Sequence, residues 1–183
     1  MESLTLCAPT MLRYDLCDKL ITSASAGTVK PTAYKVLDNG NSYANKWHNK
    51  HPLPVDIDII SPKGNIGVAS AWNHFLKTTE GLLIIANDDI EVFPNTIEML
   101  MNAYNRNTDD SNVLFSLGGI NAFAFFLVHS SIRDRIGLFD ESFYPAYFED
   151  NDYIRRIHLA KCKHKIVPGA KYIHHDGGSA TLK

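Results

Sequence analysis

Apolar residues in the first hundred positions follow two spacings, which predict alternating strands and helices. Four short apolar or alternating segments are typical of strands and cover residues 4–8, 34–37, 56–60 and 81–86. Apolar residues that recur every three or four positions are typical of helices and cover residues 12–24, 68–76 and 97–104. This alternation indicates βαβ units, and therefore a mostly parallel sheet with helices on both faces.

The second half of the chain has a different pattern, in which strands dominate. Strands are expected near Leu114, at 123–128 and around Ile166 and Tyr172, and a helix is expected to begin near Asp150. No internal repeat, low-complexity segment or Gly/Ser linker separates the two halves. The sequence therefore predicts a single α/β domain over residues 1–183, in which a mostly parallel central sheet continues into a mixed second half.

The composition, 45% hydrophobic and 21% charged, is ordinary for a globular protein and excludes several partners. The 18 basic and 20 acidic side chains give a net charge of -2, so no nucleic-acid partner is expected. The apolar runs are far shorter than the ~20 residues of a membrane span, and the first residues lack the pattern of a signal peptide. The three cysteines are odd in number and lack C-x-x-C spacing, which favours a reducing, cytoplasmic location over a disulfide framework.

Two carboxylates and an amide directly follow the most hydrophobic strand, in Asn87-Asp88-Asp89. Carboxylates at the end of a dry strand repel each other and lose solvation unless a cation lies between them. Their oxygen atoms suit Mg²⁺ or Mn²⁺, and such ions commonly share their ligand shell with substrate phosphates. The alternative interpretation of this segment is an Asx turn that leads into the next helix.

Other polar segments accompany this one in a fixed order along the chain. They are Asp38 after the second strand, Asn65-Ile66-Gly67 before a helix, and the segments 137–141 (GLFDE), 147–153 (YFEDNDY) and 174–179 (HHDGGS). From Leu4 to Ser179, the ordered set resembles the family 2 glycosyltransferases, which have the GT-A fold and use nucleotide-sugar donors. The Asn87-x-Asp89 spacing is similar to that of the rhamnosyltransferase-like branch.

The resemblance implies a GT-A-type, Rossmann-like domain with a nucleotide-binding half at 1–105 and an acceptor or catalytic half at 106–183. The positions that match the nucleotide site are Pro9, Thr10 and Asp38 for base and ribose, Asn65 and Gly67 beside the nucleoside, and Asn87 or Asp88 beside the ribose or diphosphate. The implied donor is a UDP-, dTDP- or GDP-sugar.

The same resemblance assigns the metal and the sugar side of the site. Asp89 matches the carboxylate that binds the implied Mn²⁺ or Mg²⁺, and His174 a further contact to the metal or the diphosphate. On the sugar side, Gly118 and Gly119 match the loop near the transferred sugar, and Asp150 matches the catalytic base. From the residues themselves, Glu149 competes with Asp150, because a helix start can turn either neighbour toward the donor or acceptor sugar. Tyr144, Tyr147 and Phe148 lie between two acidic segments and are candidates to stack on acceptor rings. The implied acceptor is a glycan or another glycoconjugate.

Several of these residues also have a purely structural interpretation. Asp38-Asn39-Gly40 is a common turn sequence, and carboxylates such as Asp150 are stabilised at helix N-termini. Asp152 precedes Arg156 by four residues, so these two side chains are expected to form an ion pair on the helix.

Two pairs of side chains further limit the site. His174 and His175 are neighbours on a predicted strand and point to opposite faces, so at most one of them can contact a metal. Trp72 and Phe75 have helical spacing and are expected in the core rather than beneath a sugar.

The predicted reaction is a metal-dependent, inverting transfer of one sugar, of the hexosyltransferase type, in which Asp150 takes the proton of the acceptor hydroxyl. The chain lacks the Gln-x-x-Arg-Trp element of processive synthases, which favours single additions. One alternative is a nucleotide-sugar-binding module without turnover. A sugar-phosphate nucleotidyltransferase is disfavoured, because residues 8–11 (APTM) do not form the Gly-rich, basic loop that binds a triphosphate.

Overall fold

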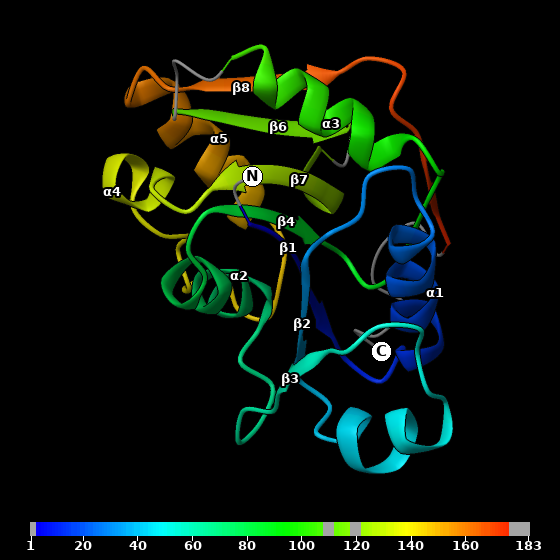
Figure 1. Cartoon of the computed structure of the whole chain (residues 1–183). Helices are drawn as coiled ribbons and strands as arrows, with labels where there is room; N and C mark the ends of the chain where they lie inside the picture. Colours follow the sequence, from blue (N-terminus) through cyan, green and yellow to red (C-terminus); the bar gives the residue numbers. More distant parts are fainter. Residues whose placement is uncertain (1–2, 108–111, 118–121, 176–183) are drawn as a thin grey trace.

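The computed structural model describes residues 3–107, 112–117 and 122–175, and its centre is a seven-stranded sheet (Figure 1). The strand order is β3-β2-β1-β4-β7-β6-β8, and β7 runs antiparallel to both of its neighbours while the other pairs are parallel. The strands are β1 (Leu4–Thr10), β2 (Ala33–Asp38), β3 (Asp58–Ile60), β4 (Leu82–Ala86), β6 (Val113–Leu117), β7 (Phe125–His129) and β8 (Lys163–Val167). The predicted α/β fold with a mostly parallel sheet is confirmed.

Helices cover both faces of this sheet, and each face has its own apolar core. One core receives side chains of α1 (Tyr14–Ser25) and α3 (Thr96–Asn105). The other receives side chains of α2 (Val68–Thr78), α4 (Ile132–Ile136) and α5 (Glu149–Leu159). Three further segments are short helical turns: η1 (Tyr43–Trp47), η2 (His48–Lys50) and η3 (Ala122–Ala124).

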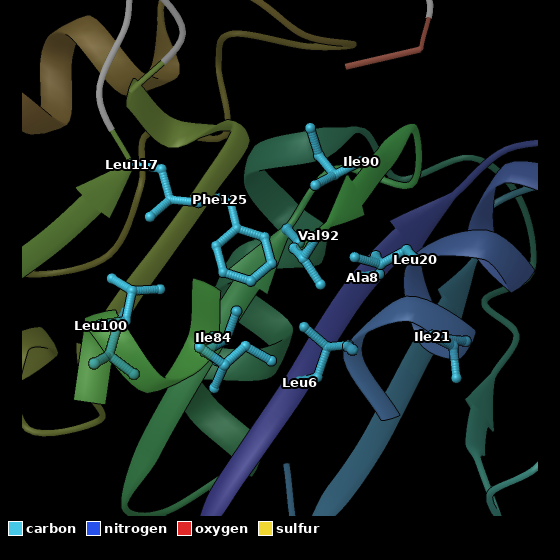
Figure 2. Close-up of a cluster of buried hydrophobic side chains, with 14 of the residues drawn as sticks. Leu6, Ala8, Leu20, Ile21, Ile84, Ile90, Val92, Leu100, Leu117 and Phe125 are labelled. Atoms are coloured by element: carbon cyan, nitrogen blue, oxygen red, sulfur yellow. The ribbon is translucent and has the colours of Figure 1, made fainter. Parts of the chain in front are cut away.

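Strand β4 lies between the two cores and belongs to both. Leu82, Ile84 and Ala86 pack into the α1/α3 core, while Leu83 and Ile85 pack into the opposite one. Figure 2 shows the first core, in which Ile84 lies beside Leu6 of β1 and Phe125 of β7, and Leu20 and Ile21 of α1 lie beyond Leu6. This arrangement explains why the segment has no polar residue: both faces of the strand exclude water.

A second, two-stranded sheet is formed by β5 (Ile90–Val92) and β9 (Tyr172–His174), which run antiparallel. Ile90 lies opposite His174, and the backbone N–H of His175 donates to the carbonyl of Asp89 at 2.9 Å. The sequence predicted a strand near Tyr172 but not its partner. The pairing brings the end of the described chain to the end of β4.

Among the described residues, no helix combines the length and the apolar character that crossing a bilayer requires.

Helix α2 holds the segment that leads to α5 through one buried amide. The Asn73 side chain accepts a hydrogen bond from the backbone N–H of Phe139 at 2.8 Å and donates to the carbonyl of Phe139 at 2.9 Å. It also donates to Glu141 at 2.8 Å. Asn73 and Phe139 are buried, so the amide satisfies main-chain groups that water does not reach.

Replacing Asn73 by alanine should therefore destabilise the protein. Each orphaned buried polar group costs about 1–3 kcal/mol, so a loss of about 2 kcal/mol or more is expected, which lowers the melting temperature by roughly 4–8 °C. Thermal unfolding followed by circular dichroism measures this change in melting temperature. Lys77→Ala is the matched control, because Lys77 lies one turn further along α2 and contacts Glu141 only through an exposed ion pair of 3.8 Å. Equal melting temperatures for the two variants would contradict the role of Asn73.

Candidate active site

A cleft of about 590 Å³ opens at the carboxyl ends of β1, β2 and β4. The segment 144–147 and the N-terminus of α5 form its other side. Predicted site residues that line it are Pro9, Thr10, Asn65, Gly67, Asn87, Asp88, Asp89, Tyr147, Glu149, Asp150 and His174. The fold thus brings together polar residues from both halves of the sequence at the edge of the sheet where open α/β folds bind ligands.

Asp38 lies beneath the cleft and not in its wall. It is fully buried, and its carboxylate accepts hydrogen bonds from the Tyr14 hydroxyl at 3.0 Å and from the backbone N–H groups of Gly40 at 2.9 Å and Tyr43 at 2.7 Å. Asp38 therefore holds the turn after β2, as its structural interpretation predicted. The next residue, Asn39, lines the cleft. Gly118 and Gly119 lie outside the described residues.

Hydrogen bonds tie the ends of β1 and β2 to the loop before α2. The backbone N–H of Asn39 donates to the carbonyl of Thr10 at 2.9 Å, and the Asn39 side chain accepts from the backbone N–H of Ile66 at 3.0 Å. Asn65 accepts from the backbone N–H of Gly67 at 2.9 Å. This wall of the cleft is consequently fixed by its own polar groups.

Gly67 is required at its position by backbone conformation and by space. Its φ of +81° lies in the left-handed region, and an added Cβ would be 3.0 Å from both the carbonyl oxygen of Pro145 and Cδ2 of Tyr144. The next residue, Val68, donates its backbone N–H to Pro145 at 2.9 Å, which satisfies an open donor at the start of α2. The two sides of the cleft therefore meet at this glycine.

Asp88 is held at the end of β4 by a hydroxyl and is largely desolvated. The Thr10 hydroxyl donates to its carboxylate at 2.7 Å. Burial raises the pKa of Asp88 to about 7, with a further contribution from the neighbouring Asp89, while the bonds from Thr10 and from the Met11 backbone oppose the rise.

Asp89 and His174 meet in the cleft although they come from opposite ends of the chain. Asp89 Oδ1 and His174 Nε2 lie 3.0 Å apart, which is within ion-pair distance, yet both atoms are buried and neither makes a hydrogen bond of acceptable geometry. The next residue, His175, directly follows β9 and turns away from Asp89, as alternation along a strand predicts. Its Nε2 lies 2.8 Å from Oε2 of Glu91.

This pair fits a divalent cation. Ligands at right angles around an ion with bonds of about 2.1 Å are separated by about 3.0 Å, and Mg²⁺ commonly takes one or two protein ligands together with waters and substrate phosphates. Within the described residues, no group of three or more His, Cys, Asp or Glu side chains is placed to hold a metal. A metal held by Asp89 and His174 has further ligand positions that waters or substrate phosphates can take.

Three carboxylates begin α5, and each has different surroundings. Asp152 lies 2.7 Å from the guanidinium of Arg156, so the predicted ion pair is confirmed. Asp150 lines the cleft, is half-buried, accepts the backbone N–H of Asn151 at 2.8 Å and has no ion pair within the described part of the chain. Glu149 is buried with 6% exposure, and its Oε2 has no hydrogen-bond partner. Burial raises the pKa of Glu149, and the charge of Asp150 raises it further.

Exposed aromatic rings form the rim of the cleft in front of α5. Tyr144, Tyr147 and Phe148 are 60%, 48% and 65% exposed. Tyr147 and Phe148 have φ values of 84° and 71°, which side-chain-bearing residues rarely adopt. Strain of this kind is found where the surrounding structure fixes a functional segment.

Trp72 and Phe75 are core residues, as predicted, but Trp72 also lines the cleft. Its side chain is 3% exposed and packs against Phe123, another cleft residue. Arg13 also belongs to the cleft wall. The apolar spacing of α2 predicts that Trp72 is buried, but it carries no signal that the same ring reaches a ligand site.

Comparison with known proteins gives a match in structure only. No protein-family model matches the sequence, and no curated protein does. Among solved structures, the mannosyltransferase PcManGT from Pyrobaculum calidifontis in complex with GDP-Man and Mn²⁺ matches with a TM-score of 0.75 at 15% identity, over 95% of this chain and 57% of that chain. The chain has the fold of this mannosyltransferase.

A second solved structure has the same fold. S. aureus TarS 1-349 matches with a TM-score of 0.72 at 14% identity, over 93% of this chain and 59% of that chain. The same protein in complex with UDP gives a TM-score of 0.71. The present chain therefore spans less than two thirds of the length of these structures. Neither of these proteins is named as a rhamnosyltransferase, so that branch stays a prediction.

The raised pKa of Glu149 predicts a pH-dependent cost to folding. The folded protein holds this proton more tightly than the unfolded chain, so stability falls as pH rises through the range between the two pKa values. Glu149→Gln removes this cost. The melting temperature of Glu149→Gln minus that of the wild type should thus be larger at pH 8 than at pH 4.5.

Glu141→Gln is the control for that measurement. The hydrogen bond from Asn73 lowers the pKa of Glu141 below its ordinary value of 4.5, so its ionised form is the stabilising one. The corresponding temperature difference should fall as pH rises, with most of the fall below pH 4.5, and should not increase between pH 4.5 and pH 8. A difference for Glu149→Gln that is independent of pH would mean that its carboxyl is not destabilised by burial.

Proposed function

We propose that the chain transfers a single sugar from a nucleotide-sugar donor to a hydroxyl of a glycan or glycoconjugate, with a divalent metal and with inversion at the anomeric carbon. The observation that carries the proposal is the convergence of Asp89 Oδ1 and His174 Nε2, neither of which makes a hydrogen bond within the described residues, in the same cleft as the carboxylate of Asp150. A cation site and a base in one cleft are what this reaction needs.

The donor nucleotide is expected along the wall formed by the ends of β1 and β2. Pro9, Thr10 and Asn65 offer contacts for the base and ribose, and Asn39 takes the position that the sequence suggested for Asp38. Asp38 acts by fixing the turn that presents Asn39. The complexes of structures with the same fold, one with GDP-Man and one with UDP, support a nucleoside diphosphate as the leaving group.

Asp89 and His174 are the residues that would hold Mn²⁺ or Mg²⁺, and Asn87 and Asp88 lie beside them. When bound, such an ion neutralises the charge that develops on the diphosphate as the glycosidic bond breaks. The complex of the mannosyltransferase with Mn²⁺ supports this choice of cofactor.

Asp150 is the proposed base. Its half-buried carboxylate would accept the proton of the acceptor hydroxyl as that oxygen attacks the anomeric carbon from the side opposite to the diphosphate. One displacement inverts the configuration. The rings of Tyr144, Tyr147 and Phe148 lie at the rim, where they can stack on acceptor sugars. Gly118 and Gly119 remain proposed neighbours of the transferred sugar.

A nucleoside diphosphate with Mn²⁺ should stabilise the protein. A ligand at about 100 times its Kd adds roughly 2.7 kcal/mol, which corresponds to a rise in melting temperature of roughly 5–11 °C for a chain of this size. Differential scanning fluorimetry measures this rise with UDP, dTDP and GDP, each with and without Mn²⁺ or Mg²⁺. Asp89→Ala should lose the metal-dependent part of the shift, measured against its own melting temperature.

Asp134→Ala is the control for Asp89→Ala, since Asp134 is an exposed residue of α4 outside the cleft. It should keep the full shift. Absence of a shift in the wild type with any of these nucleotides and either metal would refute a nucleotide-sugar site.

Asp150→Asn should lower the transfer rate by about 10²–10⁴, because the amide keeps the shape of the carboxylate but takes up no proton. Affinity for nucleotide and metal should change by less than about threefold. Initial rates at saturating donor, with release of nucleoside diphosphate as the signal, give the comparison. The donor and acceptor pair is first found by screening nucleotide sugars against glycans.

Asp152→Asn is the matched control, because Asp152 lies two residues further along the same helix and forms an ion pair with Arg156. It should cost only a few tenths of a kcal/mol of stability and leave the rate near that of the wild type. Transfer by Asp150→Asn at the wild-type rate would place the base elsewhere, and Glu149 would be examined next. Nucleotide binding without transfer to any acceptor would favour a binding module.

A further inference from the structure

Exposed apolar side chains surround the mouth of the cleft. Tyr144, Tyr147 and Phe148 form one side of it. On the side of β1, Leu12 lies between two residues that line the cleft, is 59% exposed and has a φ of 64°. A single exposed leucine is ordinary, but a group of large apolar side chains around an opening marks a surface that another molecule covers.

Packing joins these side chains into one surface. A Cβ on Gly40 would lie 2.9 Å from Cδ2 of Leu12, and a Cβ on Gly67 would lie 3.0 Å from Cδ2 of Tyr144, so each side chain packs on a glycine. The two glycines belong to loops that are joined by the hydrogen bond that the Asn39 side chain accepts from the loop before α2. Leu12 and Tyr144 are therefore held in place by the same wall of the cleft.

Basic side chains continue this surface beyond the end of β2. The turns η1 and η2 follow that strand (cyan in Figure 1) and carry Lys46 and Lys50, while Lys63 lies in the loop between β3 and α2. The rings of Tyr14 and Trp47, with centroids 6.0 Å apart, hold η1 beside the first turn of α1, next to the cleft. All three lysines are exposed, and within the residues that the structure describes none of them forms an ion pair.

Acidic side chains near this surface offset only part of its positive charge. The exposed Asp56 and Asp58 lie at or just before the start of β3, where Asp58 is in register with Lys35, so both are set back from the carboxyl end of the sheet. Asp15 is exposed on the first turn of α1, shortly after Leu12, and offsets one lysine. The surface thus stays basic, although the whole chain has a net charge of -2.

This combination of side chains indicates a bilayer surface as the partner. Leucine and aromatic rings enter the boundary between headgroups and acyl chains, while lysines beside them attract anionic headgroups. A free glycan would use the rings, but it carries no charge for the lysines. A polyanion in solution would use the lysines, but it offers nothing to Leu12.

We propose that the end of the molecule at the mouth of the cleft docks on a membrane surface that contains anionic lipid. The docking face consists of Leu12, Lys46, Lys50, Lys63, Tyr144 and Phe148. Binding of this kind is peripheral and requires no spanning helix. Because the cleft then opens toward the bilayer, the acceptor glycan is expected to be attached to a lipid, and this last step rests on the proposed function.

Sedimentation with vesicles tests the docking face without donor or acceptor. Wild-type protein should bind vesicles of phosphatidylcholine with about one third phosphatidylglycerol, and should bind vesicles of phosphatidylcholine alone much less. Each lysine near such a surface contributes roughly fivefold to the affinity, so Lys46→Gln/Lys50→Gln should bind roughly 25-fold more weakly. Leu12→Asn should bind roughly tenfold more weakly, and it should fold normally because asparagine tolerates a positive φ.

The controls change the same kinds of residue at the opposite end of the molecule. Lys30→Gln/Lys161→Gln removes two exposed lysines, one before β2 and one after α5, and gives the same net charge as the test variant. Leu159→Gln changes a leucine that is 72% exposed at the end of α5. Both controls should bind vesicles as the wild type does.

Three results of this comparison would overturn the docking face. The first is no binding of anionic vesicles by the wild type, and the second is an equal loss of binding in test and control variants. The third is binding to polyglutamate that is as tight as binding to the vesicles and unchanged in Leu12→Asn, because an acidic chain would then be the partner.

A fluorescent label reports which end of the molecule faces the bilayer. The three cysteines are buried, so a thiol introduced by Lys63→Cys or Leu159→Cys takes the label selectively. Helix α5 begins at the cleft and has 11 residues, which puts Leu159 about 15 Å from the cleft along the helix. With anionic vesicles, a nitrobenzoxadiazole label at position 63 should become brighter and shift to the blue, while a label at position 159 should not change. The reverse result, or an equal response of both labels, would contradict the proposed orientation.

The acceptor is tested separately from the docking. Transfer to a glycan on a lipid anchor in anionic vesicles should exceed transfer to the same glycan in solution by roughly tenfold or more in kcat/KM. Lys46→Gln/Lys50→Gln should lose this advantage and keep the wild-type rate on the free glycan. Equal rates on the two forms of the glycan, with vesicle binding intact, would refute the lipid-attached acceptor.

The outcomes keep the docking face and the proposed function apart. If the protein binds vesicles as described but neither binds a nucleotide nor transfers a sugar, the proposed function fails and the docking face stands. If it transfers sugar but does not bind anionic vesicles, the docking face is refuted and the proposed function stands.

Discussion

The structure depends on the complete burial of β4 between two apolar cores. A strand that is dry on both faces has a fixed position, and whatever follows it in the sequence is delivered to the edge of the sheet with little freedom. Asn87, Asp88 and Asp89 follow it directly. The same burial that makes the fold stable therefore places two carboxylates where water solvates them poorly, and the energetic consequence appears as the raised pKa of Asp88.

The fold itself is the part that the sequence predicts well. The helices α1, α2, α3 and α5 and the strand β4 have strong apolar spacing, because each packs one face or both faces on a core. The acidic strand end and the carboxylate of Asp150 could also be located from the sequence. What brings Asp150 to that strand end is the loop before α5, in which the carbonyl of Pro145 accepts the backbone N–H of Val68.

The remainder of the site depends on contacts between distant positions. β5 and β9 are three residues long, so their pairing and register are set by what they meet and not by their own pattern. Asp38 could be recognised as a polar strand end, but the direction of its side chain depends on Tyr14 and on the backbone of Tyr43. For Trp72, spacing predicts burial, while the direction of the indole N–H depends on the rings around it.

The segment between α4 and α5 is anchored to α2 at two places, and both anchors use main-chain atoms of that segment. Asn73 binds the backbone of Phe139, and Val68 binds the carbonyl of Pro145. Side chains between these anchors and at the rim can be exchanged without loss of either hydrogen bond. The side chains of this rim can therefore change while the backbone that carries them stays fixed, and the opposite wall of the cleft needs no rebuilding.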